Sequence, residues 1–383
     1  MRNLWLMGSE WLPNRSGGLN RYFHGLAHAV ADARLPAEAL VTFVRAGQTG
    51  PIPLSGMAQE GAPLQARLRG ARAWGRRAAL EGMALLNAHF ALYAWPCLNL
   101  IPQDDALIVN FHGPWADEML AEQSGLPARL KAAAARAIEK RVYRRAHRCI
   151  TLSSAFAAIL TERYGISARR ISVIPGGADL SAYERLPDRE EARRRLGWPE
   201  GRPTILSVRR LARRMGLDRL IEAASRLRCD VPELLVLIAG AGPAETDLRA
   251  RIASLGLEGT VQLLGFLPDD HLPIAYAAAD VSAMPSVSLE GFGLTLVESL
   301  AAGTPAVGAP VGGIPEVLEP LDTRLVARHS TSEAIAQALL PVLTVPDSAP
   351  DPAACRAYAA RFAWAEVFPA ILQAWRDAGA AID

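Results

Sequence analysis

Several features of secreted, metal-binding and membrane-spanning proteins are missing from this 383-residue chain. Its four cysteines are scattered with no short spacing, which argues against a zinc site or a redox pair and fits a reducing cytosol. The first residues, MRNLWLMGSEWLP, hold too few consecutive apolar residues for a signal peptide. Polar residues and a proline interrupt the longest apolar region, residues 83–101, so a spanning helix is not expected. The sequence predicts a cytoplasmic protein.

Lysine is almost absent: of the 41 basic residues, only Lys131 and Lys140 are lysines. The net charge of +2 combines a balance of +9 in residues 1–176 with a balance of −7 in residues 177–383. This asymmetry favours two domains with different partners. The basic residues of the first half gather in two amphipathic helical patterns: Arg67, Arg69, Arg72, Arg76 and Arg77, and then Arg129, Lys131, Arg136, Lys140, Arg141, Arg144, Arg145 and Arg148.

Two interpretations of these basic segments stay open. In the first, they dock the protein peripherally on an anionic surface, the inner face of the membrane. In the second, they are solvated helix faces of an arginine-rich protein. Nucleic acid is not expected as a partner, because no aromatic platform or groove-reading motif accompanies the charge.

Short apolar runs alternate along the chain with helical patterns rich in alanine, leucine and arginine. The eleven strand-like runs are residues 4–7, 39–43, 85–90, 107–111, 149–152, 171–174, 204–208, 234–239, 261–264, 281–284 and 306–308. Such alternation is typical of open parallel sheets with helices on both faces. Eleven strands are too many for one comfortable open sheet. The sequence therefore predicts an α/β protein with two Rossmann-like doubly wound domains facing a central cleft.

The most informative stretch runs from Glu290 to Glu298 and reads EGFGLTLVE. If a helix begins near Gly293, the backbone N–H groups of Phe292, Gly293 and Leu294 point out of its N-terminus, where anions bind well. The two carboxylates could accept hydrogen bonds from sugar hydroxyls. A nucleotide sugar offers both kinds of partner, a diphosphate and hydroxyl groups. The plain alternative is a surface loop that leads into an amphipathic helix.

Further loop motifs follow predicted strands, at the sheet edge where doubly wound domains bind ligands. The pair Gly17-Gly18 opens a helix, and His112 ends an apolar strand. Four arginines lie between Arg209 and Gly216, and guanidinium groups match phosphate in geometry and charge. The segment from Gly240 to Gly242 resembles a dinucleotide fingerprint that is broken after its second glycine, so a dehydrogenase is not expected. Residues 265–268 could frame a flat base.

Taken in order, these motifs resemble the retaining family 4 glycosyltransferases, also called group 1, which use the two-domain GT-B fold. The resemblance is strongest over residues 204–316, and its most specific element is the stretch from Glu290 to Glu298, which resembles the family's E-x7-E motif. It implies that residues 1–178 form an acceptor-binding domain and residues 179–360 a donor-binding domain. Residues 361–378 resemble the terminal helix that returns to the first domain.

The resemblance also implies roles for individual residues. His112 would line the reaction centre and stabilise charge near the breaking bond, and Glu290 would contact hydroxyls of the donor sugar. Arg210 and Gly18 would hold the diphosphate, and Glu298 the ribose. The implied donor-binding residues are Gly17, Gly18, Arg210, Arg214, Gly240, Gly242, Phe266, Leu267, Gly291, Phe292, Gly293, Leu294 and Glu298.

No metal and no cofactor are expected, because the family needs no divalent metal and the chain has no D-x-D motif. A nucleotide sugar would be the co-substrate. The acceptor would be a glycan, a lipid-linked molecule or a small molecule, as in polysaccharide or glycolipid biosynthesis. The resemblance implies a reaction on one face of the sugar, in which the leaving phosphate oxygen takes the acceptor's proton.

The chain departs from the family in one place. The family commonly has a lysine in an R-x4-K-G loop, and Met215 takes that position here, with Arg214 as the first substitute and Arg213 as the second. A second hypothesis is therefore kept, a nucleotide-sugar-binding protein that is no transferase: an epimerase-like enzyme or an inactive partner subunit. The presence of both Glu290 and His112 favours the transferase.

Overall fold

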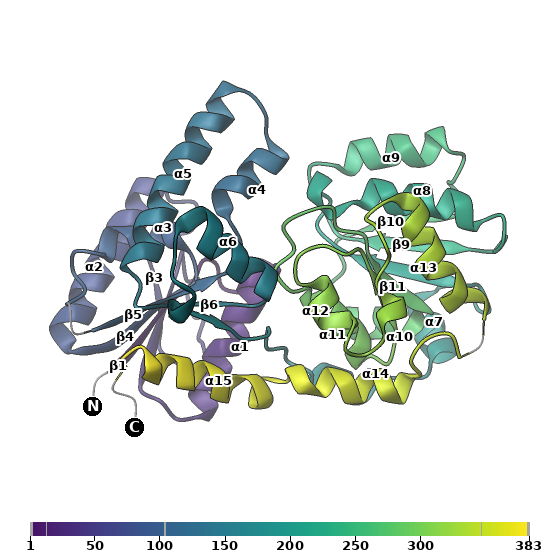
Figure 1. Ribbon diagram of the computed structural model, residues 1–383. Helices are drawn as coiled ribbons and strands as arrows, with labels where there is room; N and C mark the ends of the chain where they lie inside the picture. Colours follow the sequence, from purple (N-terminus) through teal and green to yellow (C-terminus); the bar gives the residue numbers. More distant parts are fainter. Residues whose placement is uncertain (1–2, 13, 103–104, 346, 381–383) are drawn as a thin grey trace. The chain divides into compact units, whose positions relative to one another are not determined.

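The computed structural model describes residues 3–12, 14–102, 105–345 and 347–380 (Figure 1). The chain divides into two compact units. The first unit joins Met1–Ala178 to Trp364–Asp383, and the second unit is Asp179–Ala363.

The first unit is built on a parallel sheet of seven strands in the order β3-β2-β1-β4-β5-β6-β7. All residues of β4 and β5 are buried, as expected for parallel strands that helices cover on both faces. The strands are β1 (Asn3–Met7), β2 (Ala37–Val41), β3 (Leu54–Gly56), β4 (Met83–Ala88), β5 (Ala106–Phe111), β6 (Arg148–Thr151) and β7 (Ile171–Val173).

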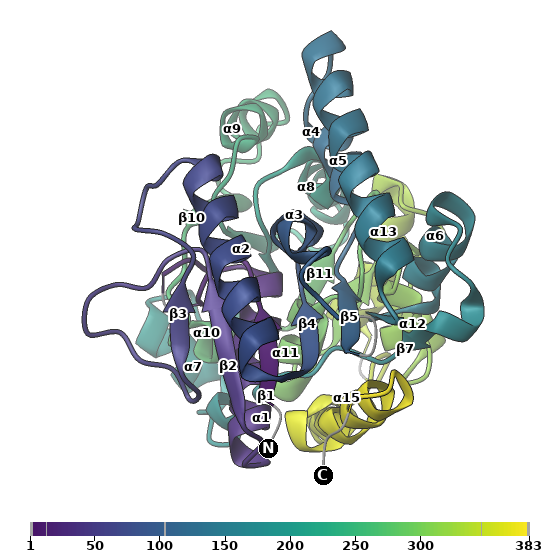
Figure 2. The ribbon, with the colours of Figure 1, turned by 90° about the vertical axis from the view of Figure 1, so that its left-hand side faces the viewer.

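Helices cover the two faces of this sheet. On one face α2 (Leu64–Glu81), α3 (Ala91–Ala94) and α5 (Leu126–Arg145) pack together, in front of the strands in Figure 2. On the other face α1 (Gly18–Asp32) packs against the C-terminal helix α15 (Trp364–Asp377). The shorter helices α4 (Trp115–Glu122) and α6 (Ser154–Tyr164) contact α5.

Trp364, the first residue of α15, packs closely against two glycines of the first unit. An ideal Cβ atom on Gly25 of α1 would lie 2.1 Å from Nε1 of Trp364, and one on Gly177 would lie 2.6 Å from Cδ2 of the same indole. Only glycine leaves room for the ring at both places. The segment that leaves the first unit and the segment that returns to it therefore meet at Trp364.

The second unit has a parallel sheet of five strands in the order β10-β9-β8-β11-β12. Its strands are β8 (Thr204–Val208), β9 (Leu235–Ala239), β10 (Val261–Gly265), β11 (Val281–Met284) and β12 (Ala306–Gly308). Its helices are α7 (Arg189–Leu196), α8 (Leu217–Leu227), α9 (Glu245–Ser254), α10 (Leu272–Ala278), α11 (Leu294–Ala301), α12 (Ile314–Leu318), α13 (Ser332–Thr344) and α14 (Pro352–Ala359). The first strand of each sheet has later strands on both sides, so the strand order reverses between β1 and β4 and between β8 and β11.

The predicted fold class is confirmed, since the described residues form two parallel sheets with flanking helices. All eleven predicted strands are present, and the three-residue strand β3 was not predicted. The returning helix begins at Trp364, whereas the sequence predicted a start at residue 361. Phe362 belongs to the second unit instead, where it packs against Phe292 and Tyr358. Among the described residues, no helix combines the length and the apolar character that crossing a bilayer requires.

Candidate functional site

In the second unit, an ion pair lies where the strand order reverses. Arg209 directly follows β8, and Glu290 lies in the loop after β11. Nη2 of Arg209 lies 2.6 Å from Oε2 of Glu290, and the hydroxyl of Ser286 donates to the same oxygen at 3.2 Å. Ligands of doubly wound domains bind at the carboxyl ends of the strands at such a reversal. The structure thus places one of the two predicted catalytic residues at the expected edge.

The Arg209 side chain is only 6% exposed, and that of Glu290 is 16% exposed. Sequence reasoning included Arg209 in the arginine-rich loop but did not select it as a site residue. Its Nη2 also contacts the sulfur of Met215, the residue at the family's lysine position. Among the described residues, Nη1 of Arg209 is buried and has no hydrogen-bond partner.

Backbone contacts fix the loop that carries Glu290. The backbone N–H of Gly313 donates to the Glu290 carbonyl at 2.9 Å. Gly312 has a φ of +58°, and a Cβ atom there would lie 1.8 Å from the same carbonyl oxygen. A side chain at position 312 would therefore push the Glu290 loop out of place.

The predicted helix N-terminus is present, because α11 begins at Leu294 after Gly293, which has a φ of +94°. Phe292 is buried and packs on Phe362, whereas Gly291 and Leu294 are partly exposed. Glu298, on the second turn, is buried and accepts a hydrogen bond from the Tyr276 hydroxyl at 3.4 Å. Its contact with a ribose stays a prediction.

The other three arginines of the loop differ in their surroundings. Nη1 of Arg214 donates to the Leu289 carbonyl at 3.0 Å, next to Glu290. Arg213 is exposed and lies 3.9 Å from Asp247, and Arg210 is also exposed. The structure therefore brings Arg209 and Arg214 to the Glu290 loop and leaves Arg213 and Arg210 at the surface.

The predicted glycines after β9 serve close packing of neighbouring loops. A Cβ atom on Gly240 would lie 1.8 Å from the Arg209 carbonyl oxygen, and one on Gly242 would lie 2.3 Å from that of Leu211. The Gly240 amide already donates to the Gly265 carbonyl at 2.7 Å. Beyond β10, the side chain of Phe266 is 62% exposed and Leu267 is partly exposed.

In the first unit, His112 is partly buried and belongs to a row of hydrogen-bonded polar groups. His112 follows β5, His89 follows β4, and Nε2 of His112 lies 3.0 Å from Nδ1 of His89. On its other side, Nε2 of His89 lies 2.9 Å from Oδ1 of Asn87. The ring of Tyr22 from α1 packs on both imidazoles.

The hydrogen bond between His89 and His112 couples the positions of the protons on the two imidazoles. Nδ2 of Asn110 also lies 2.8 Å from Nε2 of His89, so this ring nitrogen either accepts from Asn110 or donates to the Asn87 oxygen. If it accepts, Nδ1 of a neutral His89 donates to Nε2 of His112. If it donates, Nδ1 of His89 accepts, and Nε2 of His112 must donate to it. Nδ1 of His112 is then an acceptor. Burial lowers the pKa of His112 to about 4, and burial together with His112 lowers the pKa of His89 well below its usual value. At neutral pH His112 is therefore an uncharged hydrogen-bonding group.

The glycine pair of the first unit lies at the start of α1. Gly17 has a φ of +153° and precedes the helix, while no atom lies within 4 Å of a Cβ atom built on Gly18. The surroundings of Gly18 thus leave room for a ligand to approach the backbone, as the resemblance implies. Contact with a diphosphate stays a prediction.

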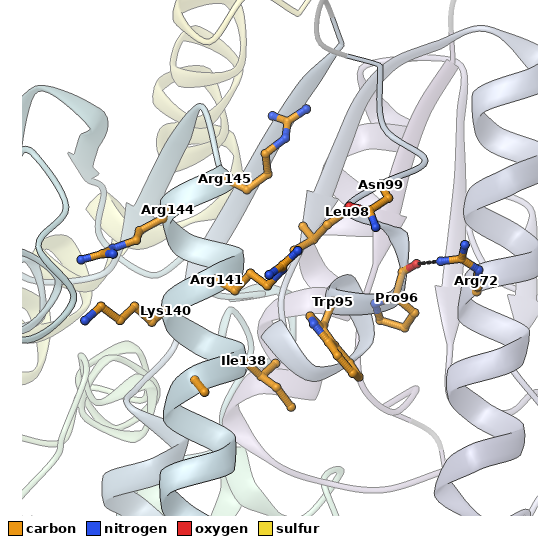
Figure 3. Close-up of a pocket in the computed structure, with 11 residues that line it drawn as sticks. Arg72, Trp95, Pro96, Leu98, Asn99, Ile138, Lys140, Arg141, Arg144 and Arg145 are labelled. Atoms are coloured by element: carbon orange, nitrogen blue, oxygen red, sulfur yellow. Dashed lines mark hydrogen bonds between the residues drawn. The ribbon is translucent and has the colours of Figure 1, made fainter.

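A basic groove, which the predicted site residues did not include, lies between α5 and the segment around Trp95 (Figure 3). Its volume is about 1160 Å³, and no carboxylate is among the described residues that line it. Figure 3 shows Arg141 directed from α5 into the groove and Lys140 and Arg144 pointing away from Trp95. The five basic lining residues are Arg72, Lys140, Arg141, Arg144 and Arg145.

A buried carboxyl group lies on the side of α5 opposite to the basic groove. Glu139 is fully buried, and its carboxyl accepts hydrogen bonds from the Tyr164 hydroxyl at 2.8 Å and from the Ala116 amide at 3.4 Å. Ala116 is in the first turn of α4, the helix that follows His112. Burial raises the pKa of Glu139 to about 7, because it favours the uncharged form.

Comparisons with known proteins agree with this architecture. The profile of the family described as Glycosyltransferase Family 4 matches residues 16–182, and that of Glycosyl transferases group 1 matches residues 188–362. Together the two profiles take in most of the chain and every described strand except β1. The chain belongs to the group 1 glycosyltransferases of the GT-B fold.

Two curated relatives show the range of proteins to which the chain is similar. It is 33% identical over 212 residues to 2-deoxystreptamine glucosyltransferase from Streptomyces kanamyceticus, covering 55% of this chain and 54% of that protein. It is 35% identical over 249 residues to D-inositol 3-phosphate glycosyltransferase from Nocardia farcinica, covering 63% of this chain and 54% of that protein. The chain spans about half the length of the curated relatives it matches.

Solved structures share the fold over nearly the whole chain. Sucrose-phosphate synthase from Thermosynechococcus elongatus superposes with a TM-score of 0.79 at 22% identity, covering 98% of this chain and 99% of that one. Anabaena HepE in complex with UDP and glucose superposes with a TM-score of 0.76 at 21% identity, covering 98% of this chain and 100% of that one. At these identities the likeness concerns the fold.

Proposed function

We propose that this protein is a retaining glycosyltransferase that moves a sugar from a nucleoside diphosphate to a hydroxyl group of an acceptor. The observation that carries the proposal is the Arg209–Glu290 pair at the strand reversal of the second unit, beside the N-terminus of α11. A buried cation, a carboxylate and a helix N-terminus together suit a diphosphate joined to a sugar.

A uridine diphosphate sugar is the first donor to test, because the structural neighbour HepE has been solved with UDP and with UDP-glucose. The relatives named above act, by their names, on 2-deoxystreptamine and on inositol phosphate, two ring compounds with several hydroxyl groups. A small polyhydroxylated acceptor is therefore tested beside glycan and lipid-linked acceptors. We assign the donor to the second unit and the acceptor to the first.

The proposed reaction balances without a protein nucleophile. The bond between the anomeric carbon and the phosphate oxygen breaks, and the acceptor oxygen bonds to that carbon on the same face. The acceptor's proton passes to the leaving diphosphate oxygen. Glu290 would hold donor hydroxyls, and His112 would orient groups near the breaking bond as an uncharged hydrogen-bonding group. Positioning and charge stabilisation would supply most of the rate, with no divalent metal.

Calorimetric titration with UDP, GDP and ADP, with and without magnesium, tests the donor part of this proposal. We expect one nucleotide to bind equally well with and without the metal, and Glu298→Ala to weaken it. Product analysis by NMR then distinguishes the alternatives: a transferase yields an α-linked product from an α-linked donor, whereas an epimerase converts the donor with no acceptor. The absence of binding to all three nucleotides would favour an inactive relative.

We also propose that the basic groove of the first unit docks the enzyme on a surface of anionic phospholipids. The exposed side of α5 continues from the groove to Leu126 and Leu130, which are 69% and 64% exposed. Their spacing from Ala137, Arg141 and Arg144 places all of them on one face of the helix. Exposed leucines beside a group of cations are typical of helices that lie at a membrane surface.

Sedimentation with vesicles tests this docking. Lys140→Gln with Arg141→Gln should reduce recovery with vesicles that contain phosphatidylglycerol, because each cation contributes about 1 kcal/mol near such a surface. Arg226→Gln with Arg228→Gln, at a surface of the second unit, is the matched control. Equal recovery of the wild type with neutral and anionic vesicles would refute the docking and leave the transferase proposal untouched.

A further inference from the structure

Arg209 is a buried cation with spare hydrogen-bonding capacity. One of its terminal nitrogens, Nη2, is paired with Glu290 at 2.6 Å, and the other, Nη1, is buried without a hydrogen-bond partner among the described residues. A buried N–H group that lacks an acceptor costs free energy, and more so when it is charged. An anion that reached Nη1 would remove this cost.

The position of Arg209 restricts what that anion can be. The residue follows β8 at the strand reversal, and its backbone N–H donates to the Ala239 carbonyl at the end of β9 at 2.9 Å. The guanidinium is thereby held beside the Glu290 loop, next to the start of α11. A planar guanidinium with a free edge matches the oxygens of a phosphate group.

We infer that Arg209 binds the diphosphate of the donor and supplies the positive charge that a lysine at position 215 would otherwise provide. This inference rests on the proposed function. Nη2 of Arg209 contacts the sulfur of Met215, so the guanidinium already occupies the space at the end of that side chain. Two cations in such contact repel each other, and the uncharged methionine is therefore the compatible partner of Arg209.

Arg214 and Arg213, the two substitutes that the sequence suggested for the lysine, are less suited to this role. Nη1 of Arg214 already donates to the Leu289 carbonyl, and this bond holds the Glu290 loop. The Arg213 side chain is 79% exposed and lies near Asp247. Arg209 thus replaces Arg214 as the substitute for the missing lysine, with Glu290 on one nitrogen and the diphosphate on the other.

Calorimetry with two ligands tests the inference, using UDP and uridine if UDP is the nucleotide that the wild type binds. Arg209→Gln should weaken UDP binding about 10- to 100-fold, the range for a hydrogen bond to a charged group, and leave uridine binding unchanged. Adding Met215→Lys to Arg209→Gln should recover most of the lost affinity, because the ammonium reaches the vacated space. Arg226→Gln on α8 is the matched control and should bind both ligands like the wild type.

The outcomes separate this inference from the proposed function. If the wild type binds UDP and Arg209→Gln binds it equally well, the inference is wrong and the donor site stands. If the variant loses UDP and uridine to the same degree, Arg209 only supports the loop, and the inference is likewise wrong. A wild type that binds no nucleotide overturns both. If Arg209→Gln does not fold, as circular dichroism would show, Arg209→Lys replaces it and should keep intermediate affinity for UDP.

Discussion

The buried carboxyl of Glu139 makes the stability of the first unit depend on pH in a direction that can be calculated. Its pKa rises from an ordinary 4.5 to about 7 in the folded protein. Between these values the folded state holds more protons than the unfolded state, so the free energy of unfolding falls as the pH rises through that window. A shift of this size corresponds to roughly 3 kcal/mol, present in full below pH 4.5 and lost above pH 7.

The histidines of the same unit act in the opposite direction. The pKa of His112 is lowered to about 4, so its unfolded form binds protons first and stability rises with pH between about 4 and 6.5. The wild-type profile alone therefore mixes two opposing effects. The difference between the wild type and Glu139→Gln isolates the carboxyl, because the histidines contribute equally to both proteins.

The assay is urea denaturation of the full chain at several pH values, followed by tryptophan fluorescence. Among the eight tryptophans only Trp198 belongs to the second unit, so the signal reports mainly on the first. Relative to the wild type, Glu139→Gln should gain about 3 kcal/mol of unfolding free energy between pH 4.5 and pH 8. Glu162→Gln, an exposed glutamate of α6, is the control. A difference between wild type and Glu139→Gln that stays constant across this range would refute the reasoning.

Three further predictions concern the second unit, the histidine pair and the C-terminal helix. Gly312→Ala should lower the unfolding free energy by about 1–3 kcal/mol and weaken nucleotide binding, because its Cβ atom would lie 1.8 Å from the Glu290 carbonyl oxygen. Gly259→Ala is the control and should have neither effect, because no atom lies within 4 Å of a Cβ atom there. His89→Gln should change the ¹⁵N shifts of His112, because the hydrogen bond that couples the two imidazoles is lost. In the wild type these shifts should stay constant from pH 8 to pH 6, and a midpoint near 6.5 would contradict the lowered pKa of His112. Gly25→Ala, normally a stabilising change within a helix, should destabilise the protein in thermal unfolding, because the methyl group would meet the Trp364 indole.

The alternation of apolar runs was sufficient to predict nearly the whole fold. Strands buried on both faces read as continuous apolar runs, and eleven such runs are strands. The edge strand β3 has the sequence LSG, which carries no apolar run and could not be found in this way. The start of α11 after Gly293 was predicted because glycine and the carboxylates around it mark a helix N-terminus.

The individual site residues were harder to predict. Four arginines lie close together after β8, and neither composition nor spacing shows that Arg209 is buried against Glu290. That depends on contacts between loops that are distant in sequence. For Glu139 a signal did exist: its helical spacing from Ala132 and Ala135 places it on the buried side of α5, where a carboxylate is unexpected. The catalytic roles of His112 and Glu290 stay predictions.

The packing of Trp364 between Gly25 and Gly177 affects how the protein folds during its synthesis. The first unit needs α15, yet this helix leaves the ribosome only after the whole second unit has been made. The second unit can therefore close first, while the side of α1 that faces α15 still exposes its apolar surface. Until Trp364 and the fully buried Trp375 arrive, the first unit is an incomplete domain, and its exposed apolar surface favours aggregation.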